Sequence, residues 1–425
     1  MQSNRRTHKT IGVLGAGIQG TCAALALAAR GCRVELFDQA SEAVSQASLW
    51  NEGKIHLGLI YAKDATSRTT DILLRGALHF DTALQRLTNR HRPAELLSSP
   101  FHYVVHRTSQ LSVDAVSAHF DTVAERYRAA RRATGLSYFG HESDFVWERM
   151  SERDRRAEYD DGETMAAFRT IELSVDPVIV ARMLRQAIAE HDRIQFQPNS
   201  RVERVLFDPS GAPAVAVKGE GTLGPYDHVV NALWQNRLQV DAGVGMEPDR
   251  PWLHRYKLAI HTAGASAPLL PSTTIMLGEY GDVVDFGGGR RYLSWYPACK
   301  LGEWADLQPP DMAPMIDHAT RQRTFDATMK ALAGIIPSVG ALDLSQAKVD
   351  VEGGYIFAWG RTGIADPESE LHHRSDIGIR SAGRYHSIDT GKYGMAPYFA
   401  DLLADRICRE HDHRNHMLLP SIEAR

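Results

Sequence analysis

Short apolar runs alternate with one longer Ala/Leu-rich run at the start of the chain. Residues 11–14 predict a short buried strand, residues 18–30 an apolar helix, and residues 33–38 a second strand. Gly31 directly follows the helix and is a typical helix stop. The start of the chain therefore predicts a strand, a turn, a helix and another strand.

The turn before this helix contains Gly15, Gly17 and Gly20 in the spacing GxGxxG. Between a strand and a helix, the first glycine permits the tight turn and the second lets the backbone approach a pyrophosphate. The third lets the helix pack on the strand. Asp38 ends the second strand about 20 residues further on, where a carboxylate accepts hydrogen bonds from ribose hydroxyls and repels a 2′-phosphate. The unit therefore predicts a site for FAD or NAD rather than NADP.

The middle of the chain changes character twice. Residues 69–172 are predicted to be largely helical and polar, with an amphipathic pattern over 117–135. A helix then follows Asp176, its expected N-cap, with Pro177 in the first position. Strands are predicted within residues 194–208, 212–219 and 226–233. The chain thus returns to α/β patterning.

Residues 251–344 form a second block, which looks like a sheet-bearing domain that interrupts the first. Strands are predicted over 255–263, 272–280 and 290–298, and a helix over 321–335. The last patterned stretch, 375–411, predicts a strand, a glycine-containing loop and a helix. This loop is expected to direct a helix N-terminus toward an anionic group, as the first turn does.

Composition and charge narrow the class of protein. The 425 residues are 43% hydrophobic and 24% charged, as in soluble globular proteins, and this length predicts two or three domains. A formal charge of −4 counts against nucleic acid as a partner. No apolar run approaches the roughly 20 residues that span a bilayer. The apolar run after the basic start is interpreted as the glycine-led helix rather than a signal peptide.

The cysteines and a histidine cluster add little chemistry. The cysteines form no CxxC pair, so neither a disulfide framework nor a zinc site is expected, and a cytoplasmic location is the simplest setting. They are Cys22, Cys32, Cys299 and Cys408. His411, His413 and His416 lie in a polar tail without a matching carboxylate pattern, and no metal site is predicted.

Four stretches spread over nearly the whole chain form a further pattern. They are IGVLGAGIQG…VELFD, ASLWNEGKIHLGLIY, SVDP with the later YDHVVNALW, and AGRYHSIDTGKYGMAP. Together they resemble the D-amino-acid-oxidase superfamily of FAD-dependent oxidoreductases, which includes glycine oxidase, sarcosine oxidase, glycerol-3-phosphate dehydrogenase and L-2-hydroxyglutarate oxidase. The resemblance implies an α/β fold with a Rossmann-like FAD-binding domain formed by residues 1–75, 172–248 and 346–425. Residues 76–171 and 249–345 would form an inserted α+β substrate domain with a mixed or antiparallel sheet.

The resemblance also implies where FAD is held. The glycine turn would hold the pyrophosphate, Asp38 the adenosine ribose, and Val202 the adenine through its backbone. Residues 50–55 would run beside the flavin, and residues 391–395 would present backbone N–H groups to its carbonyl edge. The expected FAD-binding residues are Gly15, Ala16, Gly17, Ile18, Gln19, Gly20, Asp38, Gln39, Trp50, Asn51, Glu52, Gly53, Lys54, Ile55, Val202, Asn231, Ala232, Trp234, Gly383, Arg384, Gly391, Lys392, Tyr393, Gly394 and Met395.

The stretch FAWGRTG is similar to the family segment that binds the substrate. Arg361 would correspond to an arginine that pairs with a substrate carboxylate, although Thr362 replaces the usual proline. Lys392 would either stabilise the reduced flavin through its charge or point to solvent with only its backbone used. Tyr61 and Tyr355 are expected to wall the substrate pocket.

His56 lies in NEGKIHLGLIYAKD, between Gly53 and Gly58. It resembles the histidine of a GxxHxG segment that could take a hydroxyl proton as hydride departs. It resembles less closely the histidine that carries covalent FAD in dimethylglycine-type dehydrogenases. The third alternative is a hydrogen-bonded histidine that shapes the loop.

The resemblance predicts an FAD-dependent oxidase or dehydrogenase. It would remove a hydride from the carbon bearing an amine or hydroxyl in a small carboxylate-containing substrate, an amino acid or a 2-hydroxy acid, and deliver it to flavin N5. Oxygen, a quinone or another acceptor would reoxidise the flavin, and the oligomeric state is left open. The alternatives are an NAD-dependent dehydrogenase and a flavoprotein whose FAD is structural and whose role is binding.

Overall fold

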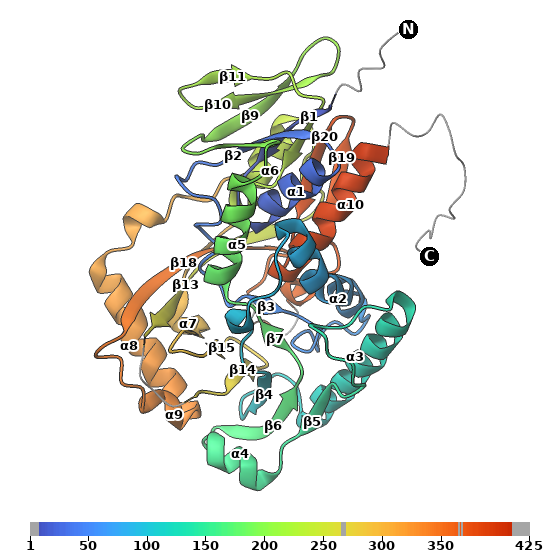
Figure 1. Cartoon of the computed structure of the whole chain (residues 1–425). Helices are drawn as coiled ribbons and strands as arrows, with labels where there is room; N and C mark the ends of the chain where they lie inside the picture. Colours follow the sequence, from blue (N-terminus) through green and yellow to red (C-terminus); the bar gives the residue numbers. More distant parts are fainter. Residues whose placement is uncertain (1–7, 265–268, 364–365, 367–368, 410–425) are drawn as a thin grey trace.

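Three stretches far apart in the sequence build one six-stranded sheet. The computed structural model describes residues 8–264, 269–363, 366 and 369–409 (Figure 1). In order across the sheet, the strands are β19 (Gly378–Ala382), β20 (Tyr385–Asp389), β12 (His228–Asn231), β1 (Thr10–Leu14), β2 (Arg33–Phe37) and β8 (Ile194–Gln197). The pairs from β20 to β8 are parallel, and β19 is antiparallel to β20. This sheet confirms the predicted Rossmann-like α/β fold.

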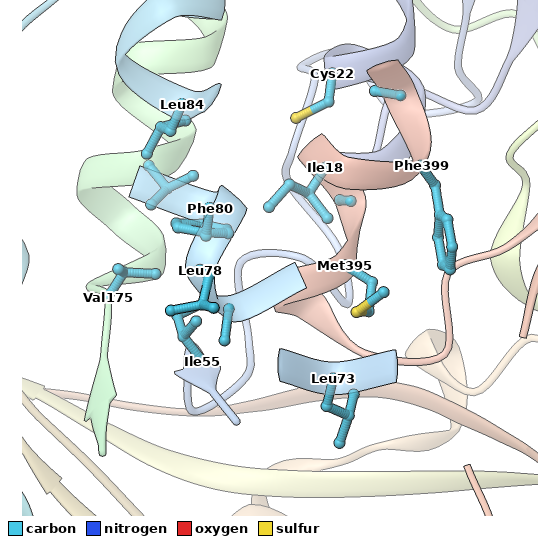
Figure 2. Close-up of a cluster of buried hydrophobic side chains, with 14 of the residues drawn as sticks. Ile18, Cys22, Ile55, Leu73, Leu78, Phe80, Leu84, Val175, Met395 and Phe399 are labelled. Carbon is cyan, nitrogen blue, oxygen red and sulfur yellow. The ribbon is translucent and has the colours of Figure 1, made fainter. Parts of the chain in front are cut away.

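Four helices pack beside this sheet and fix the glycine turn. They are α1 (Ile18–Ala29), α2 (Arg68–Thr88), α5 (Pro177–Ala189) and α10 (Ala396–Arg409). Asp176 caps α5 as predicted, because its Oδ1 accepts a hydrogen bond from the Val178 amide at 2.9 Å. Figure 2 shows Ile18 and Cys22 of α1 in one apolar cluster with Phe80 of α2, Met395 and Phe399. Burial of this cluster joins the first and last helices of the described chain.

Two smaller sheets complete this part of the molecule. β9 (Val202–Phe207), β10 (Pro213–Val217) and β11 (Gly221–Leu223) form an antiparallel sheet. β3 (Lys54–Ile55) pairs with β7 (Leu173–Ser174). This short pair holds the segment that contains His56 against a distant stretch of chain.

The second large sheet is mixed, as predicted for the substrate domain. Its strands in order are β17 (Lys300–Trp304), β13 (Trp252–Ala263), β16 (Arg291–Trp295), β15 (Gly281–Asp285), β14 (Ser272–Met276), β4 (Phe101–His106), β6 (Thr164–Thr170) and β5 (Trp147–Arg149), with β18 (Lys348–Trp359) paired to β13. β14 and β4 are parallel, and the other pairs are antiparallel. The remaining α-helices of the described chain are α3 (Val113–Thr134), α4 (Glu152–Glu158), α6 (Arg237–Gly243), α7 (Tyr296–Cys299), α8 (His318–Ile335) and α9 (Pro337–Gly340).

The prediction for residues 69–172 was wrong in one respect. The segment contains the expected long helices α2 and α3, but it also supplies β4, β5 and β6 to the second sheet. These strands were missed because each is short and their pairing partners include β14, far along the chain. The division into domains stays a prediction. Pairing of β18 with β13 along its whole length favours a boundary nearer residue 359 than residue 345.

Within the described residues, no helix is long and apolar enough to cross a membrane. The four cysteines are free thiols. The tail histidines His411, His413 and His416 lie outside the described residues.

Candidate active site

A pocket opens where the carboxyl ends of β1, β2 and β12 meet. It encloses about 1300 Å³ of atom-free space, part of it open to solvent. The predicted FAD-binding residues that line it are Gly15, Ala16, Gly17, Ile18, Gln19, Asp38, Gln39, Asn51, Glu52, Val202, Ala232, Trp234, Gly391, Lys392 and Tyr393. In open α/β sheets, ligands bind at this edge. The structure therefore brings the N-terminal turn and the C-terminal loop to one pocket.

The glycine turn is shaped so that only glycine fits. Gly15 has a φ of +91°, and a Cβ on it would lie 2.7 Å from the Ala232 carbonyl oxygen. A Cβ on Gly20 would lie 1.7 Å from the Gly15 carbonyl oxygen, so Gly20 serves the packing of α1 on β1 rather than the pocket surface. Bare backbone is thus left at the N-terminus of α1, where a pyrophosphate is stabilised by N–H groups and the helix dipole.

Asp38 braces the turn as well as lining the pocket. Its two carboxylate oxygens accept hydrogen bonds from the amides of Ala16 at 2.6 Å and Ala40 at 2.8 Å. Burial raises the pKa of Asp38. The carboxylate is placed for the predicted ribose contact, and the same group fixes the turn that would hold the phosphates.

The C-terminal loop is tied to the first helix by one glutamine. Gln19 donates to the Ala396 carbonyl oxygen at 3.2 Å and accepts from the Thr390 hydroxyl at 3.1 Å. Gly391 has a φ of +62°, which lets the loop turn so that Lys392 and Tyr393 line the pocket. The Gln19 side chain therefore links the start of α1 to the C-terminal loop through two hydrogen bonds.

Some pocket residues were not predicted. They are Val44, Ser45, Gln46, Ala47, Ser48, Arg201, Leu233, Gln235, Asn236, Ile356 and Thr390, with Tyr355 also among the lining residues. Ser48 accepts a hydrogen bond from the Ile18 amide at 3.0 Å, so it already contacts the helix N-terminus. These residues lie in loops or face the pocket from another sheet, and no local pattern marks them.

Several residues predicted to bind FAD are not among the residues that line this pocket, and their contact with FAD stays a prediction. They are Gly20, Trp50, Gly53, Lys54, Ile55, Asn231, Gly383, Arg384, Gly394 and Met395. Asn231 is buried and donates to Asp241 and Tyr385, and Lys54 forms an ion pair with Asp282 at 2.9 Å. Gly383 and Arg384 are exposed in the turn between β19 and β20.

His56 is buried between the β3–β7 pair and the second sheet. Neither ring nitrogen has a hydrogen-bond partner among the described residues, and its Nδ1 lies 3.8 Å from Glu172 Oε1. Burial, together with the charges of Lys392, Lys54 and Arg374, lowers the pKa of His56 well below its usual value. Such orphaned nitrogens argue against a histidine that only hydrogen-bonds its own loop.

Glu172 is fully buried on the far side of His56. It accepts hydrogen bonds from the Leu57 amide at 2.6 Å and from the Tyr103 hydroxyl. Burial raises the pKa of this carboxyl group. Glu172 therefore anchors the loop while remaining close enough to attract a proton held on His56.

The predicted carboxylate-binding residue, Arg361, is not part of this site. It is exposed just beyond β18 and outside the pocket lining, so the prediction based on FAWGRTG is corrected. Two other arginines are buried instead. Arg374 donates from Nη1 to the Phe357 carbonyl oxygen at 2.9 Å, and Arg255 donates from Nη1 to the Tyr296 hydroxyl at 2.6 Å. The Nε of each arginine has no partner among the described residues.

Tyr61, Lys392 and Tyr355 differ in where their side chains lie. Tyr61 is buried, its ring is T-shaped against His56 at 5.6 Å, and the Lys392 Nζ lies 5.6 Å from the centre of that ring. Burial and the nearby Arg374 lower the pKa of Lys392 to about 8. The Tyr355 ring instead packs against Tyr256, and its hydroxyl donates to the Pro310 carbonyl oxygen. Tyr61 and Lys392 thus lie together beside His56, whereas the Tyr355 side chain belongs to the packing of the second sheet.

Comparison with solved structures shows the same fold. Glycine oxidase from Geobacillus kaustophilus shares 15% identity over 97% of both chains, with a TM-score of 0.63. L-α-glycerophosphate oxidase from Mycoplasma pneumoniae, whose structure contains FAD, shares 14% identity over 95% of both chains, with a TM-score of 0.63. Iminodiacetate oxidase from Chelativorans sp. BNC1 shares 17% identity over 93% of this chain and 94% of the other, with a TM-score of 0.57. No curated protein sequence matches this chain.

The residues that line the pocket fit FAD. The glycine turn leaves bare backbone at the start of α1, the Asp38 carboxylate lines the pocket at the end of β2, and the pocket continues to the loop of Lys392. A family model described as DAO, FAD dependent oxidoreductase, matches residues 10–294, more than half of the chain. An NAD-binding unit used alone does not account for a match of that extent. The chain therefore belongs to the DAO family of FAD-dependent oxidoreductases, is an enzyme, and uses FAD as its cofactor.

Proposed function

We propose that this enzyme oxidises a small carboxylate-bearing substrate at a carbon that carries an amine or a hydroxyl group. One observation carries the proposal: His56 and Arg374, both buried and with unpartnered nitrogens, lie beside Lys392, which lines the FAD pocket. A buried cation and a buried neutral base without partners are costly unless a ligand completes them. The FAD, when bound, supplies the hydride acceptor.

Arg374 binds the substrate carboxylate in this proposal. Its main-chain amide donates to the Thr69 hydroxyl at 2.9 Å and its Nη1 to Phe357, so the guanidinium is held before any ligand arrives. The unpartnered Nε leaves one edge of the guanidinium for a bidentate contact. Such a contact orients the neighbouring C–H bond, and the orientation of the substrate is most of what the protein must supply.

His56 accepts the proton that leaves the hydroxyl or amine as hydride departs. Burial, together with the positive charges of Lys392, Lys54 and Arg374, lowers the pKa of His56 and keeps the imidazole neutral, so a ring nitrogen is available to take a proton. Glu172 Oε1, 3.8 Å from Nδ1, stabilises the imidazolium that results. Lys392 adds positive charge at the pocket wall and favours negative charge nearby.

Anaerobic bleaching of the bound FAD tests the proposal. A panel of D- and L-amino acids and 2-hydroxy acids is mixed with the holoenzyme, and the flavin absorbance is followed. We expect at least one carboxylate-bearing compound to bleach the flavin, whereas the matched primary amide bleaches it at least tenfold more slowly. If amines or alcohols without a carboxylate react equally well, the proposal is wrong. The comparison of amino with hydroxy acids decides between the two substrate classes.

Covalent attachment of FAD through His56 remains an alternative role for this residue. Acid precipitation of the purified protein distinguishes a proton-accepting His56 from a His56 that carries covalent FAD. We expect the yellow colour to stay in the supernatant, because a proton acceptor must keep its ring nitrogens free. Colour in the pellet that disappears with His56→Gln would establish the covalent link.

A further inference from the structure

Two arginines remain unpaired inside the substrate part of the site. Within the described residues, Lys54 is paired with Asp282, and Arg237 lies 3.3 Å from both Asp241 and Asp389. Neither Arg255 nor Arg374 has a carboxylate within ion-pair distance, although both are at least 93% buried. Arginine is almost never fully buried without a negative partner. Arg255 and Arg374 are therefore two buried positive charges without an ion-pair partner among the described residues.

The two arginines come from distant parts of the chain, and their charges act on each other. Arg255 on β13 is the cross-strand partner of Ile356 on β18, and Ile356 lines the FAD pocket. Directly paired residues project from the same face of a sheet, so Arg255 points to the pocket side. Arg374 is held from the segment before β19, and its charge acts on both Arg255 and Lys392. Asp389 also acts on Arg374 and Glu52 on Lys392, but neither carboxylate is within ion-pair distance of Arg255 or Arg374.

Each arginine has an edge open for a ligand. Tyr296 occupies Nη1 of Arg255 and Phe357 occupies Nη1 of Arg374, and the Nε of both is unpartnered. The Nε side of a guanidinium presents two parallel N–H groups that match the two oxygens of a carboxylate. A ligand with a single carboxylate would form an ion pair with one of the two arginines and leave the other unpaired. Neutralising both requires a ligand with two negative groups.

We propose that the substrate is a small dicarboxylic acid, with one carboxylate bound at Arg374 and the other at Arg255. This inference rests on the proposed function and narrows its substrate class to dicarboxylic amino or 2-hydroxy acids. Arg255 acts as the specificity residue, and Tyr296 positions it.

Binding of unreactive acids to the holoenzyme tests the inference without catalysis. Perturbation of the flavin spectrum is titrated with glutarate and succinate and, as monocarboxylate controls of the same carbon number, with valerate and butyrate. We expect at least one of the two dicarboxylates to bind at least tenfold more tightly than the monocarboxylate with the same number of carbons. Equal affinity of both dicarboxylates and their controls, or no dicarboxylate binding, would overturn the inference.

Three variants assign the preference to the residues. Arg255→Met should reduce the dicarboxylate advantage to less than threefold while monocarboxylate binding changes little, because Arg374 is still present. Tyr296→Phe should reduce the advantage by a smaller factor, since Arg255 stays but loses its hydroxyl partner. Arg361→Met, which removes an exposed arginine, serves as the matched control and should leave both affinities unchanged. An unchanged advantage in Arg255→Met overturns the assignment.

Bleaching with isosteric pairs separates this inference from the proposed function. Glutamate is compared with glutamine, and 2-hydroxyglutarate with its δ-amide, using both enantiomers. Faster bleaching by the dicarboxylates, by at least tenfold, supports the inference. Equal bleaching by monocarboxylates leaves the proposed function in place and overturns the dicarboxylate preference. Tight dicarboxylate binding without any bleaching supports the binding site and contradicts the proposed reaction.

Discussion

The two ends of the site, the FAD pocket and the substrate region that we propose beside it, are built from different kinds of group. The nucleotide end is made of backbone: Gly15 and Gly17 leave no side chain over the amide groups at the start of α1, and Gly20 lets α1 pack close to the turn. The substrate end is made of buried side chains, with His56, Arg255 and Arg374 contributed by segments that lie far apart in the sequence. The nucleotide end depends on glycines that lack side chains, whereas the substrate end depends on polar and charged side chains that are buried away from water.

This difference predicts how each end fails. A single added methyl group blocks a backbone site, because the neighbouring atoms are main chain and cannot move aside. Removing a charged side chain leaves the fold and the cofactor in place but changes which ligand is bound or how fast it reacts. Substitutions at the nucleotide end should therefore reduce FAD content, whereas substitutions at the substrate end should reduce activity with FAD still bound.

Gly20→Ala should have the largest effect. Its Cβ would lie 1.7 Å from the Gly15 carbonyl oxygen, so α1 must move away from the turn that holds the pyrophosphate. We expect FAD content to fall at least tenfold, measured as the ratio of flavin to protein absorbance after purification. Gly334→Ala is the matched control, because a Cβ at this exposed position of α8 meets nothing within 4 Å. A holoprotein with normal FAD content in Gly20→Ala would show that the turn is less rigid than its geometry indicates.

His56→Gln should have the next largest effect, and only on the substrate end. Loss of a positioned proton acceptor is expected to slow flavin reduction by roughly 10²- to 10⁴-fold. FAD content should stay unchanged, since His56 is not among the pocket-lining residues. Stopped-flow reduction under anaerobic conditions measures the rate.

The control for this variant is His254→Gln. His254 is also a buried histidine with unpartnered ring nitrogens, but it packs against Tyr355 and Phe357. We expect its reduction rate to remain within about threefold of the unmodified enzyme, the change typical of a residue outside the reacting set. Equal losses in both variants would mean that packing, rather than proton transfer, is what His56 provides.

The sequence predicted the backbone end well because its determinants are local. The spacing of Gly15, Gly17 and Gly20 places the tight turn within a few residues of β1 and α1, and both elements were predicted to within one residue. The C-terminal loop around Gly391 was found in the same way, from a strand, a glycine and a helix in succession. The hydrogen bonds of Gln19 that join the two loops had no sequence signal of their own.

The side-chain end was predicted only in part, because it is assembled by long-range pairing. His56 was identified from its segment and Arg361 was predicted from its motif, whereas no local motif marks Arg374. Arg255 did have a signal: with Lys257 it puts two cations on one face of a predicted strand. That face becomes informative only when β18 pairs with β13 and turns it toward the pocket.

Lys392 lies where the two ends meet, and its titration should give the smallest effect. Its pKa is lowered to about 8 by burial and by the charges of Arg374, Arg255 and Lys54, while Glu52 opposes the shift. A bound anion favours the charged lysine, so anion affinity is greatest below pH 8 and falls as the pH rises through this value. We expect glutarate affinity to fall by roughly three- to tenfold between pH 7 and 9. Spectral titration of the holoenzyme at each pH measures the change in glutarate affinity. Glutarate has no amine, so no ligand amine titrates in this range.

The Lys392→Met variant should bind glutarate more weakly at pH 7 and lose this pH dependence. If the variant keeps the same pH profile, the titrating group is another residue and Lys392 contributes only its backbone to the pocket.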